Sequence, residues 1–187
     1  IYFFEDNLAQ VYRDKKWGYI NANGVEIIEC IYKKVNSFRN GMAKVSLGGI
    51  QWGYIDSTGK TRIKPIYSYL GPIYNNQCVA YKNALYKNKK GETHYASKCG
   101  LIDSEGNILI PFQYHCITTF RDSLCAACKH KNGIMHCGFI NKNNQVIIPF
   151  KFSYKGNVIG LASAADKWRN SNKFKRYLNK KKIESKH

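Results

Sequence analysis

Long apolar runs are absent from this sequence, and proline, arginine and acidic residues are all scarce. No stretch approaches the roughly 18 consecutive apolar residues of a membrane-spanning helix, so we expect no transmembrane segment. Four prolines and fifteen glycines in 187 residues exclude a collagen-like or low-complexity chain. The sequence opens without an initiating methionine and without the basic n-region of a signal peptide, so we expect a fragment of a longer protein.

Acidic residues number 12 against 30 lysines and arginines, which gives a formal net charge of +18. This excess favours an anionic partner: RNA or another polyanion, an acidic protein, or an anionic surface. Arginine, which makes most bidentate contacts to phosphates and bases, contributes only six of the cations. The charge alone therefore also fits a protein that simply uses lysine often.

Cysteine is present in an odd number, seven. An odd count without a small, loop-rich framework favours reduced thiols over a disulfide scaffold. We therefore predict a cytoplasmic protein, which argues against an exported protein that binds the cell envelope.

Aromatic residues, by contrast, are plentiful and recur in a repeating pattern. Fourteen tyrosines and nine phenylalanines favour strands over helices. Four similar segments follow one another, and they cover residues 4–32, 38–67, 74–114 and 120–152. The extra length of the third segment falls in one place, between Tyr81 and Cys99, as expected if the repeat is a structural unit.

Each segment is predicted to form three short strands, of which the second contains Trp-Gly or a variant of it. A glycine that recurs inside a strand indicates a bulge or the close approach of another segment. Pro65, Pro111 and Pro149 are expected to follow the third strand, and they should end it or lie at a sheet edge. The residues expected to define the repeat are Trp17, Gly18, Trp52, Gly53, Gly100 and Gly138.

The turn before the third strand has the clearest local signal. An Asn or Asp opens it and can bond to the following backbone. A glycine closes it where a positive φ is expected, and the fourth segment has Asn144 there, which tolerates that conformation best among other residues. The opening residues are Asn21, Asp56, Asp103 and Asn141.

These residues resemble the WG-repeat family, also called KWG repeats, with the pattern F-x-x-G-L-A-x-V…K-W-G-Y-I-D-x-x-G-K-x-x-I-P-x-x-Y. Residues 38–67 match it almost throughout, and the other segments match at the turn, the glycine and the closing aromatic residue. The resemblance covers residues 1–165 and implies β-rich modules, mostly bacterial and often joined to other domains. No catalytic residue belongs to the motif, so none is carried over.

We predict an all-β fold: an open, solenoid-like array of about four three-stranded antiparallel meander repeats over residues 1–165. A short basic helix or tail should follow over residues 166–187. A closed propeller is less favoured, because its blades usually contain four strands.

Potential metal ligands gather in the fourth segment, where Cys125, Cys128, His130, His136 and Cys137 lie close in sequence. Cys-x-x-Cys with nearby histidines is able to bind zinc. Residues three apart in a strand point to opposite faces, however, so Cys125 and Cys128 oppose a shared ion. We predict no metal and no cofactor, with zinc as the alternative. A nucleophile with a paired base is also missing, so we predict that the protein is not an enzyme.

Two basic segments, residues 82–98 and 167–187, lie outside the repeat pattern. We expect the first to be a long hairpin loop, and the second to be a helix with Phe174, Tyr177 and Leu178 on one face. The tail would either contact phosphates or cap the last repeat. The candidate nucleic-acid-binding residues are Lys82, Lys87, Lys89, Lys90, Arg169, Lys173, Lys175, Arg176, Lys180 and Lys181.

The preferred hypothesis is a non-catalytic scaffold that mediates protein–protein interaction with another domain or subunit, as an accessory part of a larger complex. The alternative is a sequence-independent RNA-binding module that uses the basic insert and tail, with an affinity that falls steeply with salt. A third hypothesis, binding to an anionic envelope polymer or lipid surface, depends on an export signal ahead of residue 1.

Overall fold

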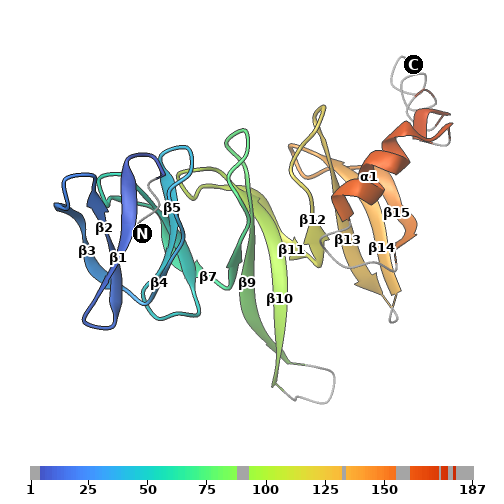
Figure 1. The fold of residues 1–187 in the computed structure, drawn as a ribbon. Helices are drawn as coiled ribbons and strands as arrows, with labels where there is room; N and C mark the ends of the chain where they lie inside the picture. Colours follow the sequence, from blue (N-terminus) through green and yellow to red (C-terminus); the bar gives the residue numbers. More distant parts are fainter. Residues whose placement is uncertain are drawn as a thin grey trace. The chain divides into compact units, whose positions relative to one another are not determined.

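The computed structural model describes residues 5–87, 93–131, 134–154, 161–172, 174–176 and 179 (Figure 1). Antiparallel strands form four sheets, and a helix follows the last of them. The predicted all-β repeat array is confirmed. Within the described ranges, no helix has the length and apolar character needed to cross a membrane.

The strands follow the repeats in chain order, one sheet to a repeat. The first sheet contains β1 (Leu8–Arg13), β2 (Lys16–Asn21) and β3 (Glu26–Tyr32). The second contains β4 (Lys34–Val35), β5 (Met42–Ser46), β6 (Trp52–Asp56) and β7 (Thr61–Tyr67). The third contains β8 (Tyr69–Leu70), β9 (Cys78–Lys87), β10 (Thr93–Ile102) and β11 (Ile108–Tyr114). The fourth contains β12 (Cys116–Ile117), β13 (Leu124–Lys131), β14 (Ile134–Asn141) and β15 (Val146–Tyr154), before α1 (Leu161–Asn170).

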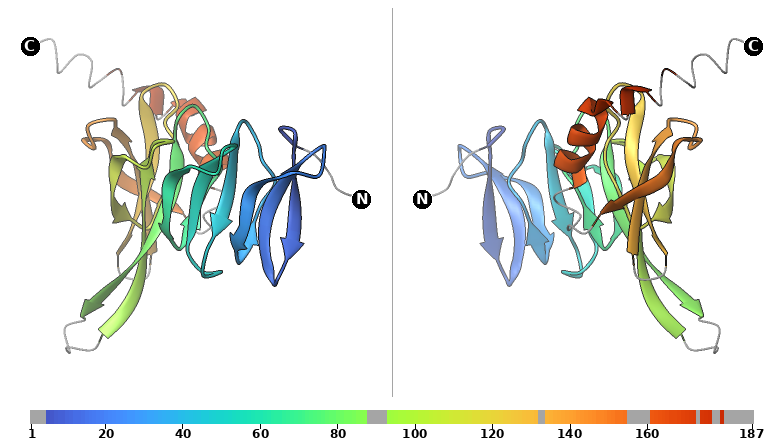
Figure 2. Two further views of the ribbon diagram at one scale, coloured as in Figure 1. Left: turned by 90° about the vertical axis from the view of Figure 1, so that its left-hand side faces the viewer. Right: turned by 90° about the vertical axis from the view of Figure 1, so that its right-hand side faces the viewer.

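The chain divides into two compact units within the third repeat. The first unit comprises residues 1–97 and 102–108, and the second comprises residues 98–101 and 109–187. In the second unit, α1 lies against the fourth sheet (Figure 1, Figure 2). The basic insert was expected to be a loop, but β9 and β10 each extend over 10 residues and absorb most of it as strand.

Three of the sheets gain a two-residue edge strand that the sequence reading did not contain. After the closing aromatic residue of one repeat, the chain pairs briefly with the first strand of the next repeat. The end of each such repeat therefore forms the edge strand of the following sheet, and backbone hydrogen bonds join the two repeats. The pairs are Lys34–Ser46, Tyr69–Tyr81 and Cys116–Cys128.

The turns before the third strands form as predicted. The Oδ1 atom of Asn21 accepts hydrogen bonds from the backbone N–H groups of Asn23 and Val25, both at 3.0 Å. The corresponding residues of the other repeats do the same. Asn144 adopts the positive φ, at 60°, that glycine adopts at the equivalent positions.

A second turn also recurs in all four repeats, and sequence reasoning missed it. Two consecutive residues with positive φ precede each first strand, and a β-bridge flanks them. Two such residues in succession indicate a type I′ turn, for which Asn-Gly is the strongest short signal. Asn40-Gly41 could therefore have revealed it. The four pairs are Asp6-Asn7, Asn40-Gly41, Asn75-Asn76 and Asp122-Ser123.

The glycine of the second strand lies opposite a bulge. The segment that approaches it closely is the third strand of the same repeat, not a neighbouring repeat. Trp17 pairs with Tyr32 and Tyr19 with Ile28, so Gly18 alone faces three residues of β3. A Cβ atom on Gly18 would overlap the carbonyl oxygen of Ile28. The same collision would occur at three further pairs: Gly53 with Ile63, Gly100 with Ile110, and Gly138 with Ile148.

The third strand keeps its alternating burial through the bulge. Ile63 and Tyr67, four residues apart, are both buried, and the side chain of Pro65 between them is half-buried. Pro65 lies between them in the bulged part of β7. Since β7 is an edge strand, the missing N–H of Pro65 costs no central hydrogen bond, as predicted for an edge. Pro65 does not follow the strand, however, because β7 continues to Tyr67.

Aromatic packing joins the first two repeats. Phe38, which begins the second repeat, packs edge-on against Tyr19 of the first, with ring centroids 4.7 Å apart. Both side chains are fully buried. The Tyr19 hydroxyl donates a hydrogen bond to the Asn36 carbonyl at 2.6 Å, and burial raises the pKa of Tyr19 above its usual range. The first sheet thus completes its core with residues of the next repeat.

We expect Gly53→Ala to lower the free energy of unfolding by about 2–3 kcal/mol, because the added Cβ must displace a backbone carbonyl of β7. Gly48→Ala is the matched control, since no atom lies within 4 Å of a Cβ at that position. Its effect should stay within about 1 kcal/mol. Chemical denaturation measures both variants, and equal losses would contradict the close approach.

Candidate binding groove in the second repeat

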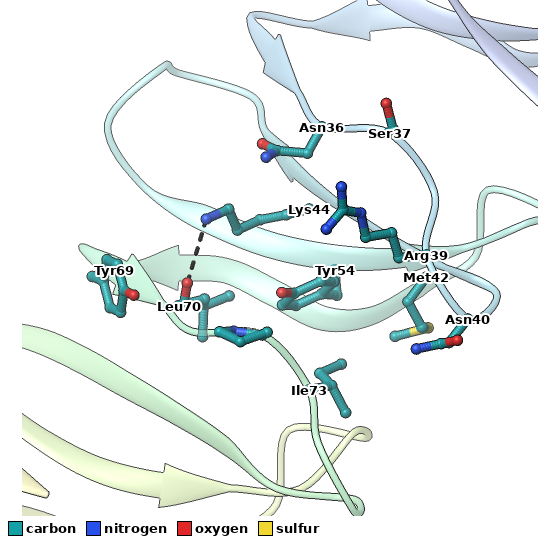
Figure 3. A pocket seen from close by; sticks show the side chains of 11 residues that line it. Asn36, Ser37, Arg39, Asn40, Met42, Lys44, Tyr54, Tyr69, Leu70 and Ile73 are labelled. Atoms are coloured by element: carbon teal, nitrogen blue, oxygen red, sulfur yellow. Dashed lines mark hydrogen bonds between the residues drawn. The ribbon is translucent and has the colours of Figure 1, made fainter. Parts of the chain in front are cut away.

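A groove with a volume of about 470 Å³ opens beside the second sheet (Figure 3). Its walls come from the chain after β4, from β5 and β6, and from β8 and the chain after it. Tyr54, Tyr69 and Ile73 provide aromatic and apolar surface, while Arg39 and Lys44 provide two cations. No acidic side chain is among the eleven described residues that line it. The groove therefore combines positive charge with apolar walls.

Lys44 lies in β5 and is half-buried. Its Nζ atom is 4.9 Å from the ring centroid of Trp52 and 5.7 Å from that of Tyr69. It donates a hydrogen bond to the Leu70 carbonyl at 3.4 Å (Figure 3). Burial lowers the pKa of Lys44, because desolvation disfavours the charged form. An ammonium group has three donors, so one long hydrogen bond and two aromatic faces leave capacity for an anion.

Arg39 lies at the other end of the groove, next to Asn40 and Met42 (Figure 3). Its side chain is 83% exposed, and its Nε atom is 3.7 Å from the carboxylate of Glu5. An exposed ion pair of this length contributes little. The guanidinium of Arg39 therefore remains able to bind a second anion.

The fourth repeat shows how the equivalent place can be filled. Arg121 precedes its type I′ turn as Arg39 precedes that of the second repeat. There, α1 supplies Asp166, whose carboxylate lies 2.8 Å from Arg121 and 2.9 Å from Arg169. The Arg169 guanidinium lies over the Phe139 ring, 5.4 Å from its centroid. An acidic residue beside apolar side chains thus already occupies one such place in this protein.

The helix segment also replaces the aromatic residue of a following repeat. Phe174 packs against Phe139 with ring centroids 5.0 Å apart and an interplanar angle of 70°. Phe38 and Tyr19 have nearly the same geometry, at 4.7 Å and 68°. The described part of the tail thus packs on the last repeat, as the capping role requires, and phosphate contact by the tail stays a prediction. The helix begins at Leu161, ahead of residue 166.

Comparison with known families now accounts for the repeat. The family model described as WG containing repeat matches residues 17–49, 52–86, 100–132 and 138–158, which is more than half of the chain. The chain belongs to the WG containing repeat family. No curated protein and no solved structure matches it. The first two WG matches begin in the second strand of one repeat and extend into the next sheet. This is expected if the end of each repeat forms the edge strand of the sheet that follows.

The predicted nucleic-acid-binding residues of the WG protein fall in several places. Arg169 is 14% exposed and donates a hydrogen bond to the Leu124 carbonyl at 2.8 Å, so it serves the packing of α1. The Lys82 ammonium lies 5.2 Å from the Tyr67 ring centroid. Further residues are placed only in part: Lys87 lies on β9, and Lys175 and Arg176 are exposed after α1. The remainder lie outside the described residues, together with Tyr177 and Leu178: Lys89, Lys90, Lys173, Lys180 and Lys181.

The cysteine-rich part of the fourth WG repeat contains a disulfide. Cys128 and Cys137 face each other across β13 and β14, with Cα atoms 4.0 Å apart, and their sulfur atoms are bonded. The expectation of reduced thiols is wrong for this pair, because direct opposition in the ladder brings the side chains together. Cys125 is opposite Ile140 and stays a buried thiol. In the described part of the chain, no three His, Cys, Asp or Glu side chains are placed to hold a metal ion.

Sequence reasoning missed Lys44, Arg39 and Asp166. Lys44 follows the usual strand alternation, so it resembles any solvated lysine. An alignment of the four WG repeats could have singled it out, because the equivalent positions hold uncharged residues. These are Gln10, Val79 and Ala126.

We expect Phe174→Ala to destabilise the second unit by about 3–5 kcal/mol, because it removes the buried aromatic residue that covers Phe139. Trp168, which contacts Phe139 and Phe152, should become more exposed and its fluorescence should shift to the red. Lys175→Ala is the control, since Lys175 is exposed beside Phe174. If both variants unfold like the unaltered protein, the helix segment does not cap the sheet.

Proposed function

We propose that this WG-repeat protein is a non-catalytic scaffold that binds an acidic segment of another protein in the groove of the second repeat. The half-buried ammonium of Lys44, which faces a groove without an acidic lining residue, supports this most directly. Buried charges are normally paired. A carboxylate from a partner would therefore complete the site.

The docking of α1 on the fourth repeat supports this choice of partner. There the carboxylate of Asp166 meets the arginine that corresponds to Arg39, and buried Ala165 packs beside it. A partner segment with Asp or Glu next to apolar residues would satisfy the same kind of surface. Attraction between charges in a partly desolvated groove exceeds that at an open surface, which gives such a segment an advantage over isolated acidic residues.

The test is the binding of a fluorescein-labelled peptide that alternates glutamate with leucine and tyrosine, measured by fluorescence anisotropy. Lys44→Met keeps the apolar stem and removes the charge. It should weaken binding by about tenfold or more, because a hydrogen bond to a charged group contributes about 1.5–3 kcal/mol. Arg39→Gln should have a smaller effect, since that side chain is largely exposed.

Two controls distinguish binding in the groove from attraction by the net charge of the protein. Lys142→Met removes the same charge from an exposed turn of the fourth repeat and should change the affinity by less than about twofold. A peptide with glutamine in place of glutamate should bind weakly. If Lys142→Met weakens binding as much as Lys44→Met, the peptide responds to overall charge and the proposed groove is wrong.

RNA binding is the second candidate, favoured by the net charge of +18 and by exposed Lys175 and Arg176. Binding of polyuridylic acid should then fall steeply with salt, and the slope reports the number of phosphates contacted. Lys175→Gln with Arg176→Gln should reduce that slope, while Lys44→Met should leave it unchanged. A salt-independent affinity would rule this candidate out.

The cytoplasm is the compartment we propose. Five of the seven cysteines are free thiols, which a reducing environment would maintain, and the disulfide between Cys128 and Cys137 is fully buried.

A further inference from the structure

Three cysteines of the fourth repeat stand in one row across neighbouring strands. The register pairs Cys116 of β12 with Cys128 of β13, and Cys128 with Cys137 of β14. Directly opposed residues of antiparallel strands place their side chains on the same face of the sheet. Cys128 and Cys137 are joined by a disulfide, whereas Cys116 is a free thiol. A thiol and a disulfide therefore share one face.

Met135 shows independently where the Cys116 thiol points. Met135 lies two residues before Cys137 on β14, so both side chains are on the same face. The Sδ atom of Met135 is 3.4 Å from the Sγ atom of Cys116. Because β13 lies between β12 and β14, this contact passes over the strand that carries Cys128. The free thiol is thus directed toward the disulfide.

The row is particular to the fourth repeat, because the fold does not need cysteine at these positions. Cross-strand pairs of other chemistry fill them in the first two repeats, including two aromatic rings whose centroids are 4.8 Å apart. The residues in place of the disulfide are the paired Tyr12 and Trp17 in the first repeat. In the second repeat they are Ser46, the last residue of β5, and Trp52, the first residue of β6. The residue in place of Cys116 is Lys34 in the second sheet and Tyr69 in the third.

We propose that Cys128 is the shared sulfur of two alternative disulfides, and that this row is a thiol–disulfide exchange site. The Cys116 thiol loses its proton, and its sulfur attacks the Sγ atom of Cys128. A Cys116–Cys128 bond forms, the Cys128–Cys137 bond breaks, and the electron pair leaves on the Cys137 sulfur, which takes up a proton. One thiol and one disulfide stand on each side, so no oxidant or reductant is consumed.

Exchange moves the cross-link from within a repeat to the junction between repeats. The present bond ties β13 to β14, the central strands of the fourth sheet. A Cys116–Cys128 bond ties β13 to β12, the short strand that follows directly after β11 of the third repeat. The exchanged form therefore fixes the junction and frees a thiol at Cys137, where the first two repeats carry tryptophan. The site therefore has two states, which differ in the strand to which Cys128 is bonded.

Burial makes this exchange slow in the folded protein. All three cysteines are fully buried, and burial raises the pKa of Cys116 to about 12, so little thiolate is present at neutral pH. The two-residue strand β12 is the shortest of the three strands involved, so its opening is the easiest route to the reactive arrangement.

The variant Cys137→Ser removes the present disulfide partner of Cys128 and tests whether Cys116 forms the bond instead. The folded variant is incubated with oxidised glutathione, quenched in acid, alkylated and digested, and its peptides are analysed by mass spectrometry. We expect a Cys116–Cys128 disulfide as the predominant product, with loss of alkylation at both residues. Two results would overturn the proposal. One is alkylation or separate glutathionylation of Cys116 and Cys128, and the other is a disulfide that joins Cys128 to Cys125 or Cys99.

The matched control is Cys128→Ser, which leaves Cys116 and Cys137 two strands apart. Strands are about 4.8 Å apart, so these Cα atoms are too distant for a disulfide and both cysteines should be alkylated. A bond between them would show that the row does not select the partner. The unaltered protein in a glutathione redox buffer provides a test that needs no variant. Two disulfides, both containing Cys128, support the proposal, and Cys128–Cys137 alone contradicts it.

Discussion

The close contact between the second-strand glycine and a third-strand carbonyl is the constraint on which each repeat depends. A side chain at Gly18 or Gly53 would collide with that carbonyl, so the bulge forms only where glycine stands. Across the bulge, the buried isoleucine and the closing tyrosine of the third strand stay on the same face. The two-residue strand that follows the closing tyrosine can then pair with the next sheet, as β4 does after Tyr32. The joining of one repeat to the next therefore depends on the absence of a Cβ atom at the second-strand glycine.

Sequence reasoning found the residues that enforce this constraint because they recur in the chain, although it expected the glycine to approach a neighbouring repeat. The glycine and the Asn or Asp turn recur in every repeat, and each has a local physical cause. The two-residue edge strands escaped prediction, since Lys34-Val35 carries no periodicity and pairs only with residues beyond a turn. The type I′ turn was within reach at Asn40-Gly41, but Asp122-Ser123 contains no glycine and hides the same turn.

The candidate sites depend on contacts between segments far apart in the chain, which is why composition misjudged them. Arg169 counted as surface charge until the structure placed it over Phe139. The cysteines were weighed as metal ligands by their spacing, whereas the antiparallel pairing of β13 and β14 decides that Cys128 meets Cys137. Lys44 acquires its surroundings only when β8 passes beside it.

Arginine and lysine carry different parts of the positive charge. Five of the six arginines are in ion pairs, and three of these pairs join one repeat to the element that follows. They are Glu5–Arg39, Arg62–Glu105 and Arg121–Asp166. The planar guanidinium suits such pairing, which leaves the excess charge on lysines, whose attraction for anions is general and screened by salt. A specific anion contact needs a lysine that is held in place, and Lys44 is held by two aromatic rings and a carbonyl. The general charge would then bring an acidic partner to the surface, and Lys44 would determine where it binds.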